Sequence, residues 1–67
     1  MLTRLPVRDV KPGDVVHETL DAGTPNERWR RYIVTASRSH GTDGWRLSYA
    51  NGGDQAYLAG DTVQVEV

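Results

Sequence analysis

The stretch Pro12-Gly13-Asp14-Val15-Val16 decides which fold the sequence predicts. Gly and Asp tolerate the left-handed backbone conformations of tight turns, whereas β-branched residues favour a pleated, half-buried strand. The same order of turn and strand recurs near the other end, where Gly60-Asp61 precedes Thr62-Val63-Gln64-Val65-Glu66-Val67. A turn that leads into a strand at both ends indicates an all-β protein.

Turn chemistry divides the rest of the chain into short strands. Predicted turns, rich in Gly, Asn, Asp and Pro, lie at residues 21–27, 39–44, 51–53 and 59–61. The five predicted strands cover residues 14–20, 28–37, 45–50, 55–59 and 62–67. Residues 1–13 are predicted to be an extended lead-in, because Pro6 cannot donate to a sheet ladder. No segment has the 3.6-residue apolar repeat of a helix, so little or no helix is expected.

Alternation within the strands predicts which side chains share a face. The three sets are Trp45, Leu47 and Tyr49; Val63, Val65 and Val67; and Tyr32, Val34 and Ala36. The valine set is expected to point into the core. In strand 28–37, a β-bulge would let both Ile33 and Val34 contribute to that core.

The composition excludes several classes of protein. A chain of 67 residues forms one domain (1–67) with a thin core. It contains no cysteine and two histidines, which cannot supply the four ligands of a structural zinc site. No segment has the apolar length of a membrane span or signal peptide, so a cytoplasmic location is expected. The net charge of −1 argues against a surface that is basic throughout.

Catalytic and cofactor-binding motifs are missing from the sequence. Ser37, Ser39 and His40 are close in sequence, but neighbours on a strand and turn do not by themselves form a catalytic dyad. The carboxylates next to glycines are instead predicted to accept backbone hydrogen bonds in turns; they are Asp14, Asp43, Asp54 and Asp61. We therefore expect a protein that is not an enzyme and that has no cofactor or metal.

The pattern of strands and turns resembles the SH3-like barrels. In these, a short lead-in and a Pro-Gly-Asp-Val turn precede the first strand, a long loop, a three-stranded meander and a terminal strand. The resemblance implies a small five-stranded antiparallel barrel in residues 14–67. The opening Val7 to Val16 and the Val-x-Val ending also resemble small uncharacterised proteins of actinobacteria and their bacteriophages. This second resemblance implies such a source, with the host cytoplasm as the location if the protein is phage-encoded.

One segment has the composition of a binding surface. Residues 28–46 carry five arginines against a single aspartate, a net charge of +4 between two acidic ends. Aromatic residues alternate with the arginines, and Trp, Tyr and Arg dominate the energetics of protein interfaces. The candidate binding residues are Arg28, Trp29, Arg30, Arg31, Arg38, His40, Trp45 and Arg46.

This segment leaves three functions open. The leading hypothesis is a noncatalytic module that binds a protein partner. The second is a nucleic-acid-binding barrel, in which arginines contact phosphates and Trp29 or Tyr32 stacks on a base. The third is a homo-oligomer that pairs through the last strand or the Pro6 segment. In the purely structural interpretation, Trp45 and Tyr32 belong to the core, Trp29 caps the barrel end and the arginines lie on solvated strands.

Overall fold

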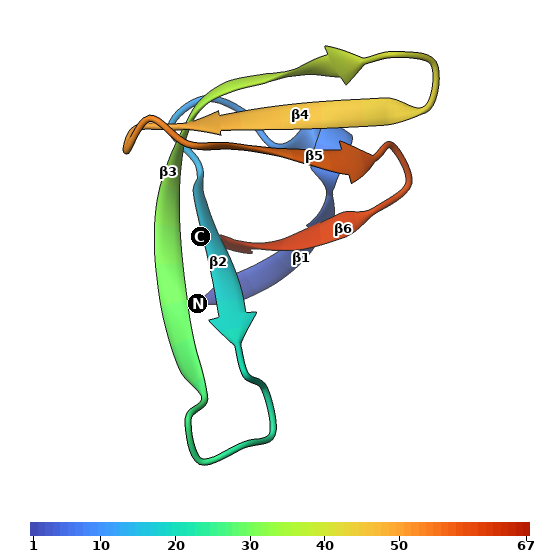
Figure 1. The fold of residues 1–67 in the computed structure, drawn as a ribbon. Helices are drawn as coiled ribbons and strands as arrows, with labels where there is room; N and C mark the ends of the chain where they lie inside the picture. Colours follow the sequence, from blue (N-terminus) through green and yellow to red (C-terminus); the bar gives the residue numbers. More distant parts are fainter.

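The structure is a computed structural model that describes residues 1–67, and it is built almost entirely of strands (Figure 1). One 3-10 turn, η1 (Val7–Asp9), is the only helical element. The strands are β1 (Leu2–Pro6), β2 (Val15–Leu20), β3 (Arg28–His40), β4 (Gly44–Tyr49), β5 (Asp54–Leu58) and β6 (Thr62–Glu66). The all-β prediction is confirmed. No helix has the length and apolar character needed to cross a membrane.

All six strands belong to one antiparallel sheet with the order β1-β6-β2-β3-β4-β5. The sheet is open, because β1 and β5 are its edges and do not pair with each other. The prediction of five strands is therefore wrong by one. Residues Leu2–Pro6 of the lead-in form β1, which pairs along its whole length with β6. Pro6 is the last residue of this edge strand, where a missing amide donor is tolerated.

Two turns of the same design place β2 and β6. Asp14 accepts a hydrogen bond from the Lys11 N–H at 2.9 Å, and Gly13 adopts a φ of 96° that favours glycine. Near the other end, Asp61 accepts a hydrogen bond from the Leu58 N–H at 3.0 Å, and here too the donor lies three positions before the aspartate. The predicted role of these two aspartates as turn residues is confirmed. Asp54 differs, because it is the first residue of β5.

A β-bulge in β3 bends the sheet over on itself. The register shifts between Val34 and Ala36, which makes Thr35 the extra residue. Figure 1 shows the strand turning at this level, with its first half beside β2 and its second half beside β4. The bulge moves Ala36 away from the face that carries Tyr32 and Val34, so these three do not share a face as predicted. The bulge follows Ile33 in the chain and does not turn its side chain inward, so Ile33 is 54% exposed and does not enter the core as predicted.

The core lies between the two halves of the folded sheet. Its buried residues are Val7, Val10, Val16, Val34, Leu47, Tyr49, Val63 and Val65. The predicted inward positions of Val63 and Val65 are confirmed, while Val67 is 73% exposed, because it lies beyond the end of β6. Leu47 and Tyr49 share one face as predicted, and that face is the inner one. Val7 and Val10 belong to the segment predicted as a lead-in. They are buried because η1 turns the chain inward.

Candidate functional site

The eight candidate binding residues fall into two groups and one partly buried side chain, Trp45. Arg28 to Arg31 lie on the first half of β3, which pairs with β2. Arg38, His40 and Arg46 lie on the β3–β4 hairpin, beyond the bulge. Arg31 and Arg38 are seven positions apart, roughly 20 Å of extended chain, and the bend lies between them. The basic segment therefore does not form one patch.

The first group is divided between the two faces of β3. Trp29, Arg31 and Ile33 are on the outer face, away from the core, and are called the β3 patch below. Trp29 is 66% exposed and Ile33 is 54% exposed, and Arg31 lies between them along the strand. Arg28 and Arg30 are on the opposite face, and both are exposed because the β2–β3 hairpin projects beyond the core (Figure 1). Trp29 therefore does not cap the end of the fold.

In the second group, most of the charged and polar side chains already contact other residues of the protein. Arg38 and Arg46 are cross-strand partners, and Arg46 forms an ion pair with Asp54 at 3.0 Å. The Arg46 guanidinium also lies 3.4 Å from the His40 ring. Trp45 is on the inner face, where its indole N–H donates to the Ser37 hydroxyl at 2.8 Å. Like Tyr32, it packs against the core, as the structural interpretation predicts.

A charged cluster that sequence reasoning missed adjoins the β3 patch. Glu66 of β6 accepts two hydrogen bonds from Arg31, at 2.9 and 3.0 Å, and lies 2.8 Å from His17 Nε2. The three residues come from β6, β3 and β2. Only the register that places β6 beside β2 brings them together, and no local signal in the sequence encodes that register. The cluster holds the Arg31 side chain against the sheet.

The hydrogen bond to His17 and those from Arg31 lower the pKa of the Glu66 carboxyl below its ordinary value of 4.5. The Glu66 carboxyl therefore binds a proton more tightly in the unfolded chain than in the folded protein. The ionised carboxylate thus stabilises the fold, and this stabilisation is complete above pH 4.5 and is lost as the pH falls through the lowered pKa. We expect wild type to lose more stability than Glu66→Gln between roughly pH 6 and pH 3. Thermal midpoints followed by circular dichroism would show this, and parallel pH profiles would contradict it.

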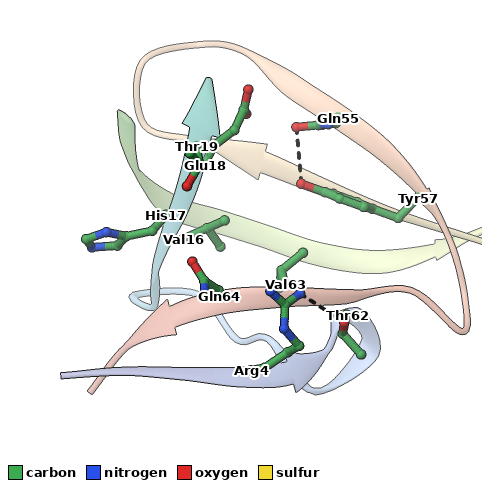
Figure 2. A pocket seen from close by; sticks show the side chains of 10 residues that line it. All are labelled: Arg4, Val16, His17, Glu18, Thr19, Gln55, Tyr57, Thr62, Val63 and Gln64. Atoms are coloured by element: carbon green, nitrogen blue, oxygen red, sulfur yellow. Dashed lines mark hydrogen bonds between the residues drawn. The ribbon is translucent and has the colours of Figure 1, made fainter. Parts of the chain in front are cut away.

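A small depression of about 270 Å³ lies where β2 and β6 separate (Figure 2). The lining residues are Arg4, Val16, His17, Glu18, Thr19, Gln55, Tyr57, Thr62, Val63 and Gln64. Pairing between β2 and β6 ends at His17 and Gln64, so the residues that follow in the register, Glu18 with Val63 and Thr19 with Thr62, are not paired. Arg4 donates to the Thr62 hydroxyl at 3.2 Å. The depression thus combines the Arg4 guanidinium, the Glu18 carboxylate and several uncharged polar groups.

Tyr57, which lines this depression, belongs to a cluster of three tyrosines. The Tyr32 and Tyr49 rings stack with centroids 4.7 Å apart. The Tyr57 hydroxyl donates its single hydrogen to Gln55 at 3.1 Å. In its 3.1 Å hydrogen bond with the Tyr49 hydroxyl, Tyr57 is therefore the acceptor and Tyr49 the donor. Burial raises the pKa of both Tyr49 and Tyr57. Both hydroxyls therefore stay protonated at neutral pH and hold β4 to β5.

The serine and histidine side chains that the sequence places near one another do not lie together in the structure. Ser37 and Ser39 are on the inner face of β3, while His40 is on the outer face. The Ser37 hydroxyl is already bonded to Trp45. No three His, Asp or Glu side chains lie close enough together to hold a metal ion.

The fold and the site together define a small all-β protein with one open, six-stranded antiparallel sheet and an exposed aromatic and basic patch. No protein-family model, no curated protein and no solved structure matches the chain.

Proposed function

We propose that the chain is a noncatalytic, SH3-like small β-barrel module that binds another protein through the β3 patch. One observation carries the proposal: Trp29 and Ile33, two large apolar side chains, are exposed on the same face of one strand, with an arginine between them. Scattered exposed apolar residues are normal on protein surfaces, but the combination of Trp, Arg and an aliphatic neighbour is typical of interface hot spots.

The long bent β3 supports the SH3-like part of the proposal. Its first half pairs with β2 and its second half with β4, so one strand belongs to both halves of the folded sheet. The core lies between those halves. A sheet that bends in this way encloses a barrel-like interior even where its edges are not hydrogen-bonded to each other.

Nucleic-acid binding has less support than protein binding. The arginines of residues 28–46 are divided between two regions, and Arg31 and Arg46 are each paired with a carboxylate. A phosphate backbone needs several free cations along one track to be held firmly. Low-salt gel shifts with single- and double-stranded DNA and RNA would test this alternative, and salt-sensitive binding would favour it over the protein partner.

We expect Trp29→Ala to abolish capture of the partner while leaving the fold intact. An exposed tryptophan contributes little to folding, whereas a hot-spot residue at an interface contributes about 2 kcal/mol or more to binding. The measurement is quantitative affinity capture from a lysate of the source organism. Unchanged circular dichroism spectra would establish that the variant folds.

The matched control is Leu58→Ala. Leu58 is similarly exposed, at 67%, but lies on the distant edge strand β5. A protein that is captured by wild type and Leu58→Ala, but not by Trp29→Ala, supports the proposal. Equal capture by all three forms would remove the β3 patch as the binding surface.

A further inference from the structure

The first half of β3 is an open edge of the sheet. Pairing with β4 begins only at Val34, so Arg28–Ile33 have a neighbouring strand, β2, on one side alone. In Figure 1 this half of β3 forms the outer margin of the molecule, with no strand beside it on the side away from β2. An open edge presents unpaired backbone groups that another chain can join.

The hydrogen bonds at the bend show which backbone groups face the open side. Val34 exchanges two hydrogen bonds of 2.8 Å with the turn that precedes β2, so its backbone faces β2. Ile33 faces the other way, since its carbonyl accepts from the Ala50 N–H at 2.9 Å. Hydrogen-bonding direction alternates along an antiparallel strand. The backbone N–H and C=O groups of Trp29 and Arg31 therefore point to the open side.

The side chains beside this edge differ between its two faces. On the outer face are Trp29 and Ile33, which are exposed and apolar. On the inner face are Arg28 and Arg30, exposed cations for which no ion pair is formed. A strand added here would place alternate side chains on the two faces. Apolar side chains would meet the tryptophan and isoleucine, and the others would meet arginines.

We propose that the open edge of β3 binds an extended acidic segment of a partner protein, which adds to the sheet as a further strand. This inference rests on the proposed function and specifies the chemistry of the ligand: apolar residues that alternate with Asp or Glu. A second copy of the chain is a poor occupant of the same edge. Pairing two β3 edges by a two-fold axis would bring arginines of one copy opposite arginines of the other, and opposed like charges destabilise a sheet.

Edge strands often carry charged residues that prevent unwanted pairing. That role accounts for the arginines of β3 taken alone. It does not account for Trp29 and Ile33, because large exposed apolar side chains on an edge strand promote association instead of preventing it. Two cations without an ion pair on the inner face, and two apolar side chains beside the Glu66-paired Arg31 on the outer face, select which strand can pair.

The test uses the whole protein and a short capped peptide of alternating Glu and Val, followed by amide hydrogen exchange. In the free protein, the Trp29 and Arg31 amides exchange faster than those of Arg30 and Tyr32, which face β2. Peptide at saturation is expected to slow exchange at Trp29 and Arg31 by about tenfold or more. A matched peptide with Lys in place of Glu, and one N-methylated at alternate residues, are expected to bind at least about tenfold more weakly.

Two arginine variants locate the charge effect on the correct half of β3. Arg30→Gln is expected to weaken binding of the acidic peptide, while Arg38→Gln, beyond the bulge, leaves it unchanged. Equal binding of the N-methylated or lysine peptide, protection at β1 or β5 instead, or no saturable binding would each overturn the inference. If the partner of the Trp29 capture experiment is still found in those cases, the proposed function stands and only strand addition fails.

Discussion

Leu47→Ala is expected to lower the free energy of unfolding by about 2–5 kcal/mol, the largest loss from any single truncation in this chain. Leu47 lies on β4 with 0% of its surface exposed, and it is among the largest fully buried side chains. Removing most of it leaves a cavity that the surrounding valines cannot fill. A single core of this size supplies only about 3–5 kcal/mol, so the variant is expected to be largely unfolded at room temperature.

Urea titration followed by tryptophan fluorescence and circular dichroism measures this effect. Leu58→Ala is the matched control, because the same atoms are removed from a side chain that is 67% exposed. Its expected change is within about 0.5 kcal/mol. Equal unfolding midpoints for the two variants would contradict the placement of Leu47 in the core.

Gly44→Ala is expected to cost about 1–3 kcal/mol, the typical penalty for forcing extra atoms into a packed site. Gly44 is the first residue of β4 and the cross-strand partner of His40. A Cβ at this position would collide with the His40 backbone carbonyl oxygen. Because this oxygen belongs to the backbone, it cannot move aside as the end of a flexible side chain can. Relief of the collision requires a shift of the β3–β4 hairpin, which carries Arg38 and Arg46.

Gly60→Ala is the control for this substitution. No atom lies near the position that its Cβ would take, and the φ of Gly60 is outside the left-handed region. The stability of Gly60→Ala is expected to be unchanged or raised by up to about 1 kcal/mol, since alanine restricts the unfolded chain. Thermal unfolding of both variants gives the comparison, and a Gly44→Ala protein as stable as Gly60→Ala would show that the hairpin accommodates a side chain.

Local signals were sufficient to predict most of the strands. The Asn51-Gly52-Gly53 hairpin is present, and Gly52 has the positive φ, 92°, that the pattern indicates. Turn residues also marked the long loop between β2 and β3 in its observed place. These features depend on residues that are adjacent in the chain, so the sequence alone was sufficient to locate them.

Pairing between distant segments was not predictable in the same way. β1 becomes a strand only because β6 lies beside it, and the weak alternation of its five residues does not reveal this partner. The bulge at Thr35 was anticipated as a type of feature but not at its position, so Ile33 stays on the outer face with Trp29 and Arg31 and does not contribute to the core. The sheet register also decides that Arg31 meets Glu66 and that Trp45 turns inward, which separates residues that a charge count had grouped.

The place of β6 between β1 and β2 sets the order in which the molecule is assembled. Strands β2 to β5 follow one another in both the chain and the sheet, so each pairs with its neighbour by closing a loop much smaller than the whole chain. β1 has no neighbour until the last strand in the sequence arrives, which requires closing nearly the whole chain into a loop. Contacts of such long sequence separation slow folding. We therefore expect the meander that carries the β3 patch to form before the two terminal strands pair.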